Sequence, residues 1–289
     1  MKLTKANKTH IKQLCICYEN NEIGLISGHI KNNKLENIIL NHHYKFDDFK
    51  NIPKDLKSNQ LSDVHSKVVL MNDYEFFLAE LPVNISLNKE SDLKKYITYY
   101  QAENANELII DYIEIPQKRI SSQKKCYLVT VSNSSINQMI ERLGEYNIRV
   151  NNIQIIETAL HLYFKKFYAN SGEVIYLYHF NNEIIIFLNK NYELYMVRRI
   201  TLQGIIDEKS VNDLGEQILS TVEYCNMNIG LFDCNNICVE KNSKLNRTFI
   251  TLLSEYTKIP CQFISTNELF NQEYTNKFFH IGLGGLMAS

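Results

Sequence analysis

The residues with the clearest chemical potential lie in two short segments that repeat the same four letters. Asn20-Asn21-Glu22-Ile23 recurs as Asn181-Asn182-Glu183-Ile184. Glu22 and Glu183 carry carboxylates, which are hard oxygen ligands for a metal ion. Solvated turn residues are the simpler interpretation of both carboxylates. Asn tolerates the positive φ of a tight hairpin, so we expect two matching turns.

Three other places hold residue types found in catalytic sites, and ordinary structure accounts for each. His42 and His43 are adjacent on a predicted strand, where neighbouring side chains point to opposite faces and cannot chelate one ion together. His161 lies in an apolar helical pattern, where a satisfied or partly exposed histidine is the usual finding. The run Ser132-Asn133-Ser134-Ser135 reads as a helix N-cap. We predict no catalytic residue and no metal ligand.

The cysteines point to reduced thiols, because their count is odd and no secretion signal is visible. Cys234 and Cys238 are spaced too loosely for a zinc site and lack a second ligand pair. We expect most of the cysteines to be small buried core residues, because free cysteine is often buried. The seven are Cys15, Cys17, Cys126, Cys225, Cys234, Cys238 and Cys261.

The composition is that of a globular protein with a substantial core. The chain has 289 residues, 45% of them hydrophobic and 22% charged. Its 31 basic and 32 acidic residues are mixed and give a net charge of −1, which argues against nucleic acid as a main partner. No apolar run is long enough to span a membrane, and the N-terminal residues lack the apolar core of a signal peptide. We therefore expect a cytoplasmic protein with no direct membrane span.

The two repeated turns lie inside matching patterns of three apolar runs. Residues 11–46 and 172–202 each read as a three-strand meander, which predicts a duplicated α/β fold. The polar segment Asn170-Ser171-Gly172 is the best boundary, so we expect halves at residues 1–171 and 172–289. An inserted α+β subdomain is expected at about residues 47–125.

The remaining patterns alternate between strands and helices. Residues 68–71 and 75–81 read as two short strands across the turn Asn72-Asp73. The polar stretch 47–67 carries no predicted element. Further strands are expected at 107–115, 126–131, 148–156, 237–240 and 261–265, and helices from residue 91, after residue 132, and at 157–168, 211–227 and 245–257.

Several short segments occur in an order and spacing that carry a resemblance. They are Glu80-Leu81-Pro82, 110–116, 127–131, 150–160, the strand ending in Arg198-Arg199-Ile200, the helix from Glu216 to Tyr224, and Ile281-Gly282-Leu283-Gly284-Gly285-Leu286. Together they resemble the actin/sugar-kinase/heat-shock ATPase fold, and more closely its PilM and MshI branch of type IV and MSHA pilus biogenesis proteins. This chain has Leu219 where that branch carries an Arg.

The resemblance implies a duplicated actin-like, ribonuclease H-like fold. The residues of the two repeated turns, however, argue against catalysis. In active members each first turn carries an Asp, which binds magnesium through water, and Gly residues that let N–H groups approach phosphate. Neither turn here has them, and their glutamates would repel phosphates. ATP and magnesium are therefore not expected as cofactors. A vestigial cleft, if any, would involve Asn20, Asn21, Asn181, Asn182, Gly282, Gly284 and Gly285, although close strand–helix packing also explains the glycines.

The resemblance also implies a partner. We expect a non-catalytic scaffold at a type IV pilus or a type II-like secretion platform. It would bind the cytoplasmic tail of a PilN-like bitopic inner-membrane protein, beside other platform proteins. The tail would dock in a groove between the first meander and the inserted module. Within the tyrosine cluster Tyr96, Tyr99, Tyr100 and Tyr112, Tyr99 is the expected contact, because core packing accounts for Tyr96 and Tyr100.

Two alternatives stay open. The first is an actin-fold ATPase or small-molecule kinase with atypical phosphate turns. The second is a filament-forming cytoskeletal protein without ATP control.

Overall fold

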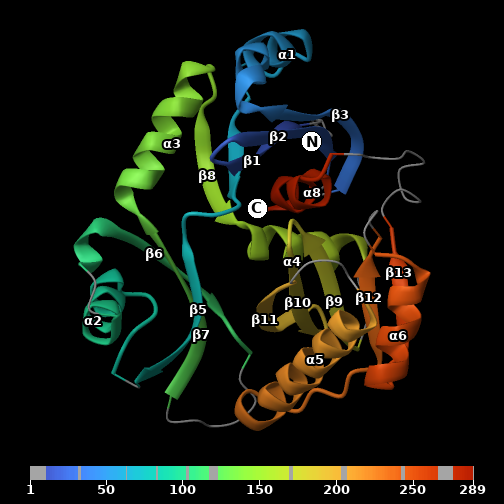
Figure 1. Ribbon diagram of the computed structural model, residues 1–289. Helices are drawn as coiled ribbons and strands as arrows, with labels where there is room; N and C mark the ends of the chain where they lie inside the picture. Colours follow the sequence, from blue (N-terminus) through green and yellow to red (C-terminus); the bar gives the residue numbers. More distant parts are fainter. Residues whose placement is uncertain are drawn as a thin grey trace, which may run out of the picture. The chain divides into compact units, whose positions relative to one another are not determined.

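The computed structural model consists of two compact units (Figure 1). The first unit draws on Met1–Asp73, Ser134–Phe167 and Glu273–Ser289, and the second on Tyr74–Asn133 and Tyr168–Gln272. The structure describes residues 11–31, 34–62, 64–82, 84–101, 104–116, 123–168, 172–202, 207–241, 245–265 and 276–288.

The first unit is built on a five-stranded sheet in the order β3-β2-β1-β4-β8. The meander β1–β2–β3 is antiparallel, whereas β4 pairs in parallel with both β1 and β8. The middles of β1 and β2 are continuous buried runs, as expected for strands covered on both faces. The strands are β1 (Ile11–Glu19), β2 (Glu22–Lys31), β3 (Lys34–Lys45), β4 (Ser66–Leu70) and β8 (Val150–Ile155).

Among the described residues, five helices accompany this sheet. The 3-10 helix η1 and helix α1 follow β3, within the polar stretch for which no element was predicted. Helix α8, red in Figure 1, packs on α4 and on β1 and β2. The helices are η1 (Phe46–Asn51), α1 (Ile52–Ser58), α3 (Asn133–Glu145), α4 (Ile156–Phe167) and α8 (Phe279–Met287).

The second unit repeats this plan in a sheet of order β11-β10-β9-β12-β13. Again a meander is followed by two strands added in parallel. This shared strand order confirms the prediction of a duplicated α/β fold. The strands are β9 (Glu173–Phe180), β10 (Glu183–Lys190), β11 (Glu193–Thr201), β12 (Asn236–Glu240) and β13 (Cys261–Ile264), and the helices are α5 (Glu208–Asn228) and α6 (Arg247–Thr257).

Both helices of the repeated plan begin at a side-chain cap. Asp207 accepts a hydrogen bond from the backbone N–H of Ser210 at the start of α5, at 2.8 Å. Asn246 accepts one from Phe249 at the start of α6, at 3.0 Å. These bonds satisfy N–H groups that a helix end leaves without an intrahelical partner. The helices therefore begin at Glu208 and Arg247 rather than at the expected residues 211 and 245.

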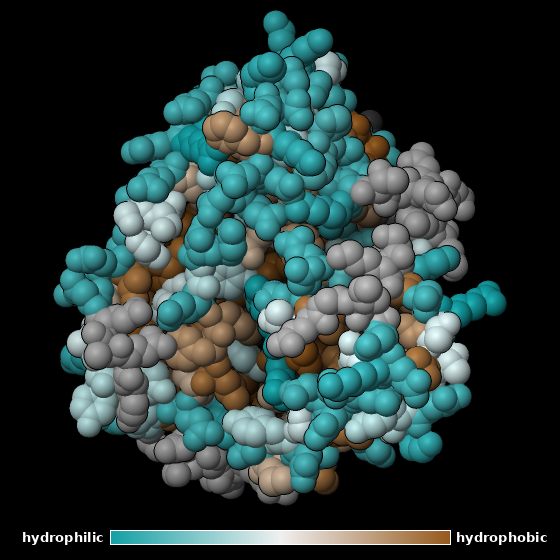
Figure 2. Space-filling view, in the orientation of Figure 1, coloured by the Kyte–Doolittle hydropathy of each residue, from teal (hydrophilic) through white to brown (hydrophobic). Residues whose placement is uncertain are grey.

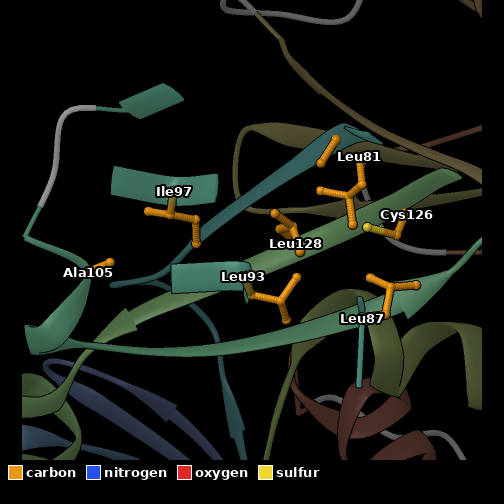
Figure 3. Packing of buried hydrophobic residues seen from close by; sticks show 8 residues of the cluster. Leu81, Leu87, Leu93, Ile97, Ala105, Cys126 and Leu128 are labelled. Carbon is orange, nitrogen blue, oxygen red and sulfur yellow. The ribbon is translucent and has the colours of Figure 1, made fainter. Parts of the chain in front are cut away.

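The second unit also contains a module with a three-stranded antiparallel sheet of order β5-β7-β6. Helix α2 covers one face of this sheet, and Leu93 and Ile97 of α2 pack against Leu81 and Leu128 of the strands (Figure 3). The elements are β5 (Glu75–Pro82), α2 (Glu90–Gln101), η2 (Ala105–Glu107), β6 (Leu108–Glu114) and β7 (Gln123–Ser132).

The limits of this module differ from the inserted subdomain expected at about residues 47–125. Its strands run from Glu75 to Ser132, whereas β4 belongs to the sheet of the first unit. β4 and β5 follow one another across Asn72-Asp73 but lie in different sheets. The proposed halves at 1–171 and 172–289 stay a prediction, and Asn170 and Ser171 lie outside the described residues.

All seven cysteines carry free thiols, and Cys15 and Cys17 are fully buried in β1. Among the helices in the described ranges, none is long and apolar enough to cross a membrane.

Candidate functional site

The first repeated turn joins β1 to β2, and its two glutamates are held by a cation from the far end of the chain. Glu19 and Glu22 face each other across the hairpin. The Lys277 ammonium lies 3.1 Å from Glu19 Oε2 and also pairs with Glu22. His43 Nε2 lies 3.2 Å from Glu22 Oε2. The carboxylates of this turn are therefore already occupied by side chains of the same unit.

The electrostatics of Glu22 follow from these neighbours. Partial burial favours the neutral carboxyl, but Lys277 and, to a smaller extent, His43 outweigh it and lower the pKa of Glu22. The Lys277 ammonium also lies 4.7 Å from the centre of the Phe278 ring. Phe278 is fully buried against Gly24, where an added Cβ would lie 2.6 Å from Phe278 carbons. The buried ring thus fixes the position from which Lys277 reaches the turn.

A second cation uses the backbone of the same turn. Arg142 on α3 donates a hydrogen bond from Nη1 to the carbonyl oxygen of Asn20, at 2.9 Å. Its guanidinium lies 5.1 Å from the Phe46 ring and 5.2 Å from the Phe49 ring. Arginine stacks well on aromatic faces, so this arrangement holds the turn in one conformation.

The second repeated turn joins β9 to β10 and pairs its carboxylate in the same way. Glu183 Oε2 lies 3.4 Å from Arg199 Nη1, and Arg199 also bonds the Tyr74 hydroxyl. Asn181 adopts a positive φ of 52°, and the carbonyl of Asn182 accepts a hydrogen bond from Leu202, at 2.7 Å. Both turns therefore present glutamates whose negative charge is offset by a cation of the same unit.

The three C-terminal glycines lie inside helix α8 and are surrounded by protein. A Cβ on Gly284 would lie 1.8 Å from the carbonyl oxygen of Ala159 on α4. A Cβ on Gly282 would lie 2.4 Å from Ile26, and one on Gly285 2.3 Å from the Cys15 sulfur. Close helix–helix and helix–strand packing accounts for all three. A vestige of a nucleotide cleft at these glycines stays a prediction.

The adjacent histidines have separate surroundings. The His42 ring lies 4.4 Å from the ring of Tyr44, whereas the His43 ring lies 5.3 Å from that of Phe278. Within the described ranges, no group of three His, Cys, Asp or Glu side chains has the geometry of a metal site. A polar hollow of about 440 Å³ is lined by His42, Tyr44, Asp48, Asn51, Lys54 and Asp55. In it the Tyr44 hydroxyl donates to Asp55 at 2.6 Å, and burial together with this carboxylate raises the pKa of Tyr44.

The inserted module offers an apolar sheet face on the side opposite α2. Strand pairing places Leu78, Tyr127 and Ile113 in one row across this face, but Tyr127 is only 2% exposed and its hydroxyl bonds Val197 of β11. The next row contains Phe76 and Val129, which are only partly buried. Brown atoms gather in Figure 2 in the region where Figure 1 draws β5 and β7. This face was not predicted from the sequence, although the consecutive apolar residues 76–79 of β5 and 108–110 of β6 place apolar side chains on both faces of the sheet.

The predicted partner contact, Tyr99, lies on α2 and is 80% exposed. Tyr96 is partly buried against the module core, in agreement with the packing interpretation. The Tyr112 hydroxyl donates to Asn88 at 2.9 Å. The side chain of Tyr100 lies outside the described residues.

No family model matches this chain, and no curated protein matches it in sequence. Solved structures nevertheless match it along nearly its whole length. A PilM-PilN type IV pilus biogenesis complex aligns with a TM-score of 0.71 and 11% identity, over 97% of this chain and 98% of the other.

Two further structures match over most of both chains. The cytoplasmic domain of EpsL, an inner-membrane component of the type II secretion system of Vibrio cholerae, aligns with a TM-score of 0.54 and 11% identity, over 92% and 98% of the two chains. A Bacteroides thetaiotaomicron protein with an actin-like ATPase fold and unknown function aligns with a TM-score of 0.53 and 10% identity, over 94% and 100%. The chain therefore has the actin-like fold, and its architecture is PilM-like.

Proposed function

We propose that the protein is a non-catalytic, actin-like scaffold of a type IV pilus or a type II-like secretion platform. The observation that carries this proposal is the end-to-end structural similarity to the PilM-PilN complex, which covers 97% of this chain. The similarity to the EpsL cytoplasmic domain supports the same class of assembly. In this role the protein lies at the cytoplasmic face of the inner membrane, held there by a membrane protein.

The ion-paired turns support the non-catalytic part of the proposal. Glu22 and Glu183 occupy the turns where active members of the fold bind nucleotide phosphates, and each is paired with a cation of its own unit. A phosphate at either turn would be repelled by the glutamate carboxylate. Neither turn contains a glycine that would let backbone N–H groups approach the phosphate closely. The alternative, an ATPase or kinase with atypical turns, would require these ion pairs to open.

The proposed partner is a PilN-like bitopic protein whose cytoplasmic tail binds the inserted module. Two surfaces of the module are candidates for this contact. One surrounds Tyr99 on α2, and the other is the apolar sheet face with Ile109, which is 41% exposed. An extended peptide added to an exposed sheet edge or laid in a groove is a common recognition mode, and Ile109 lies on the edge strand β6.

The test is a calorimetric titration of the protein with the synthetic N-terminal tail of a PilN-like protein from the same genome. Tyr99→Ala, matched to Thr98→Ala on the same helix, tests the α2 surface. Ile109→Ser, matched to Asn106→Ser in η2, tests the sheet face. Binding that either test variant weakens at least about tenfold, while its control binds normally, supports the proposal and assigns the surface. Absence of binding to the wild-type protein contradicts the proposed partner.

A further inference from the structure

Helix α5 buries one side and exposes another on which apolar residues recur. Val211, Leu214, Ile218, Thr221 and Cys225 are buried. On the opposite side Leu219 is 39% exposed and Met227, two turns later, is 63% exposed. A solvent-facing helix side normally carries polar residues, so this one differs from the usual amphipathic pattern.

A third apolar side chain, that of Leu231, is exposed to solvent in the turn that follows α5. Leu231 is 70% exposed, while the next residue, Phe232, is only 2% exposed. Lys190 donates to the carbonyl oxygen of Leu231 at 2.8 Å, and Asn226 accepts from the backbone N–H of Phe232 at 2.5 Å. The backbone on both sides of Leu231 is thus fixed, and its exposure is a property of an ordered turn.

The same side of α5 is acidic. Asp213, Glu216 and Glu223 are exposed, and none of them forms an ion pair or hydrogen bond with another described residue. Glu216, Glu223 and Met227 lie at helical spacings of seven and four residues, which places them along one stripe. Lys209 is the only basic residue within α5. Arg198 of β11 donates to Gln217, Ser220 and Thr221 of this helix but forms no ion pair with the three carboxylates among the described residues. The glutamates of the two repeated turns, by contrast, are paired with cations.

We propose that the acidic α5 face, defined as Asp213, Glu216, Leu219, Glu223, Met227 and Leu231, docks a basic amphipathic helix of a protein partner. Apolar side chains of such a helix would cover Leu219, Met227 and Leu231, and its Lys or Arg residues would pair with the three carboxylates. Charge complementarity selects this occupant. An anionic membrane surface or a nucleic acid would be repelled by the same carboxylates.

This docking surface goes beyond the proposed function and does not depend on it. It lies on α5, whereas the proposed tail-binding surfaces lie on the inserted module. Failure of one proposal therefore leaves the other standing.

The test uses two fluorescent amphipathic peptides of about 18 residues, long enough to form a helix on a surface. One has Leu on its apolar side and Lys elsewhere, and the other replaces every Lys by Glu. Fluorescence anisotropy measures their binding to the full chain at about 50 mM and about 300 mM salt. We expect the Leu/Lys peptide to bind at least tenfold more tightly than the Leu/Glu peptide, and to weaken in high salt.

Variants separate docking from general charge attraction. Glu216→Lys with Glu223→Lys should weaken the Leu/Lys peptide at least tenfold, and Leu231→Ser should weaken it about fivefold. Glu141→Lys with Glu145→Lys, on the exposed side of α3, makes the same change in net charge and should leave binding unaltered. Equal binding of both peptides, or equal losses in the two charge variants, would overturn the proposal. Self-association of the chain that Leu231→Ser abolishes would overturn it too, because the occupant would then be a second copy.

Discussion

At the residue scale, the Lys277 ammonium pairs with both glutamates of the first repeated turn and is the main cause of the lowered pKa of Glu22. Lys277 bridges two carboxylates that would otherwise face each other across a hairpin. Because the pKa of Glu22 is lowered in the folded protein, its ionised form stabilises the fold above the ordinary glutamate pKa. That contribution is lost as the pH falls through the lowered value.

Lys277→Met removes this cation while keeping an unbranched side chain over the Phe278 ring. We expect a loss of about 1 kcal/mol in the free energy of unfolding at neutral pH, since the pair is partly exposed to solvent. The loss should shrink in acid, where Glu22 is protonated in both states. Urea unfolding across this pH range measures it, with Lys57→Met at the exposed end of α1 as the control. A loss that is constant with pH would show that the ion pairs contribute nothing.

Glycine at position 284 is required by the contact between α4 and α8. The Cβ of Gly284→Ala would fall 1.8 Å from a backbone oxygen, which no side-chain rotation relieves. We expect a loss of about 3 kcal/mol or more in unfolding free energy, measured by urea denaturation. Gly144→Ala on α3 is the matched control, because nothing lies within 4 Å of its Cβ and alanine favours a helix. Equal stability of the two variants would contradict the packing interpretation.

At the element scale, local patterns predicted the strands and helices whose partners are near in sequence. Both meanders were correct, because alternating apolar runs and Asn-containing turns determine a hairpin locally. β4 and β5 were each found, but nothing local shows that they pair with β1 and β7 in different sheets. Helix α1 was missed within a polar stretch, since only Ile52 and Leu56 are buried there.

The hydroxyl of Tyr127 is one of the contacts that join the inserted module to the second sheet, beside the bond between Arg199 and the Tyr74 hydroxyl. Tyr127 donates to the carbonyl oxygen of Val197 on β11 at 2.9 Å and accepts from its N–H at 2.8 Å. Tyr127→Phe leaves both buried backbone groups without this partner, so we expect a loss of about 1–3 kcal/mol in unfolding free energy. Hydrogen exchange should accelerate at the Val197 amide.

Tyr112→Phe provides the comparison for that prediction. In the wild-type protein the Tyr112 hydroxyl donates to Asn88 in an exposed hydrogen bond of the same module. We therefore expect Tyr112→Phe to change the free energy of unfolding by less than about 0.5 kcal/mol. Unfolding free energies and amide exchange of both variants test the difference. Unchanged protection of Val197 in Tyr127→Phe would mean that other contacts hold the module to β11.

At the scale of the whole molecule, the fold is similar to that of solved structures that share only 10–11% of their residues with this chain. The repeated letters drew attention to Glu22 and Glu183, but the sequence favoured solvated turn residues for both. It did not reveal Lys277 or Arg199 as their partners. Lys277 is separated from Glu22 by most of the chain, so only the folded sheet and α8 bring them together.

The ion pairs of the two repeated turns predict how the melting temperature responds to nucleotide. Any ligand that binds the folded state raises the melting temperature in proportion to the logarithm of its concentration over its dissociation constant. We expect millimolar Mg-ATP or Mg-ADP to shift the melting temperature by less than about 1 °C, because the glutamate of each repeated turn is already paired with a cation. Magnesium without nucleotide is the control, since a shift with the metal alone would mean that the glutamates bind it. A rise of several degrees with Mg-ATP only would show that the ion pairs yield to phosphate. The ATPase alternative would then replace the non-catalytic scaffold.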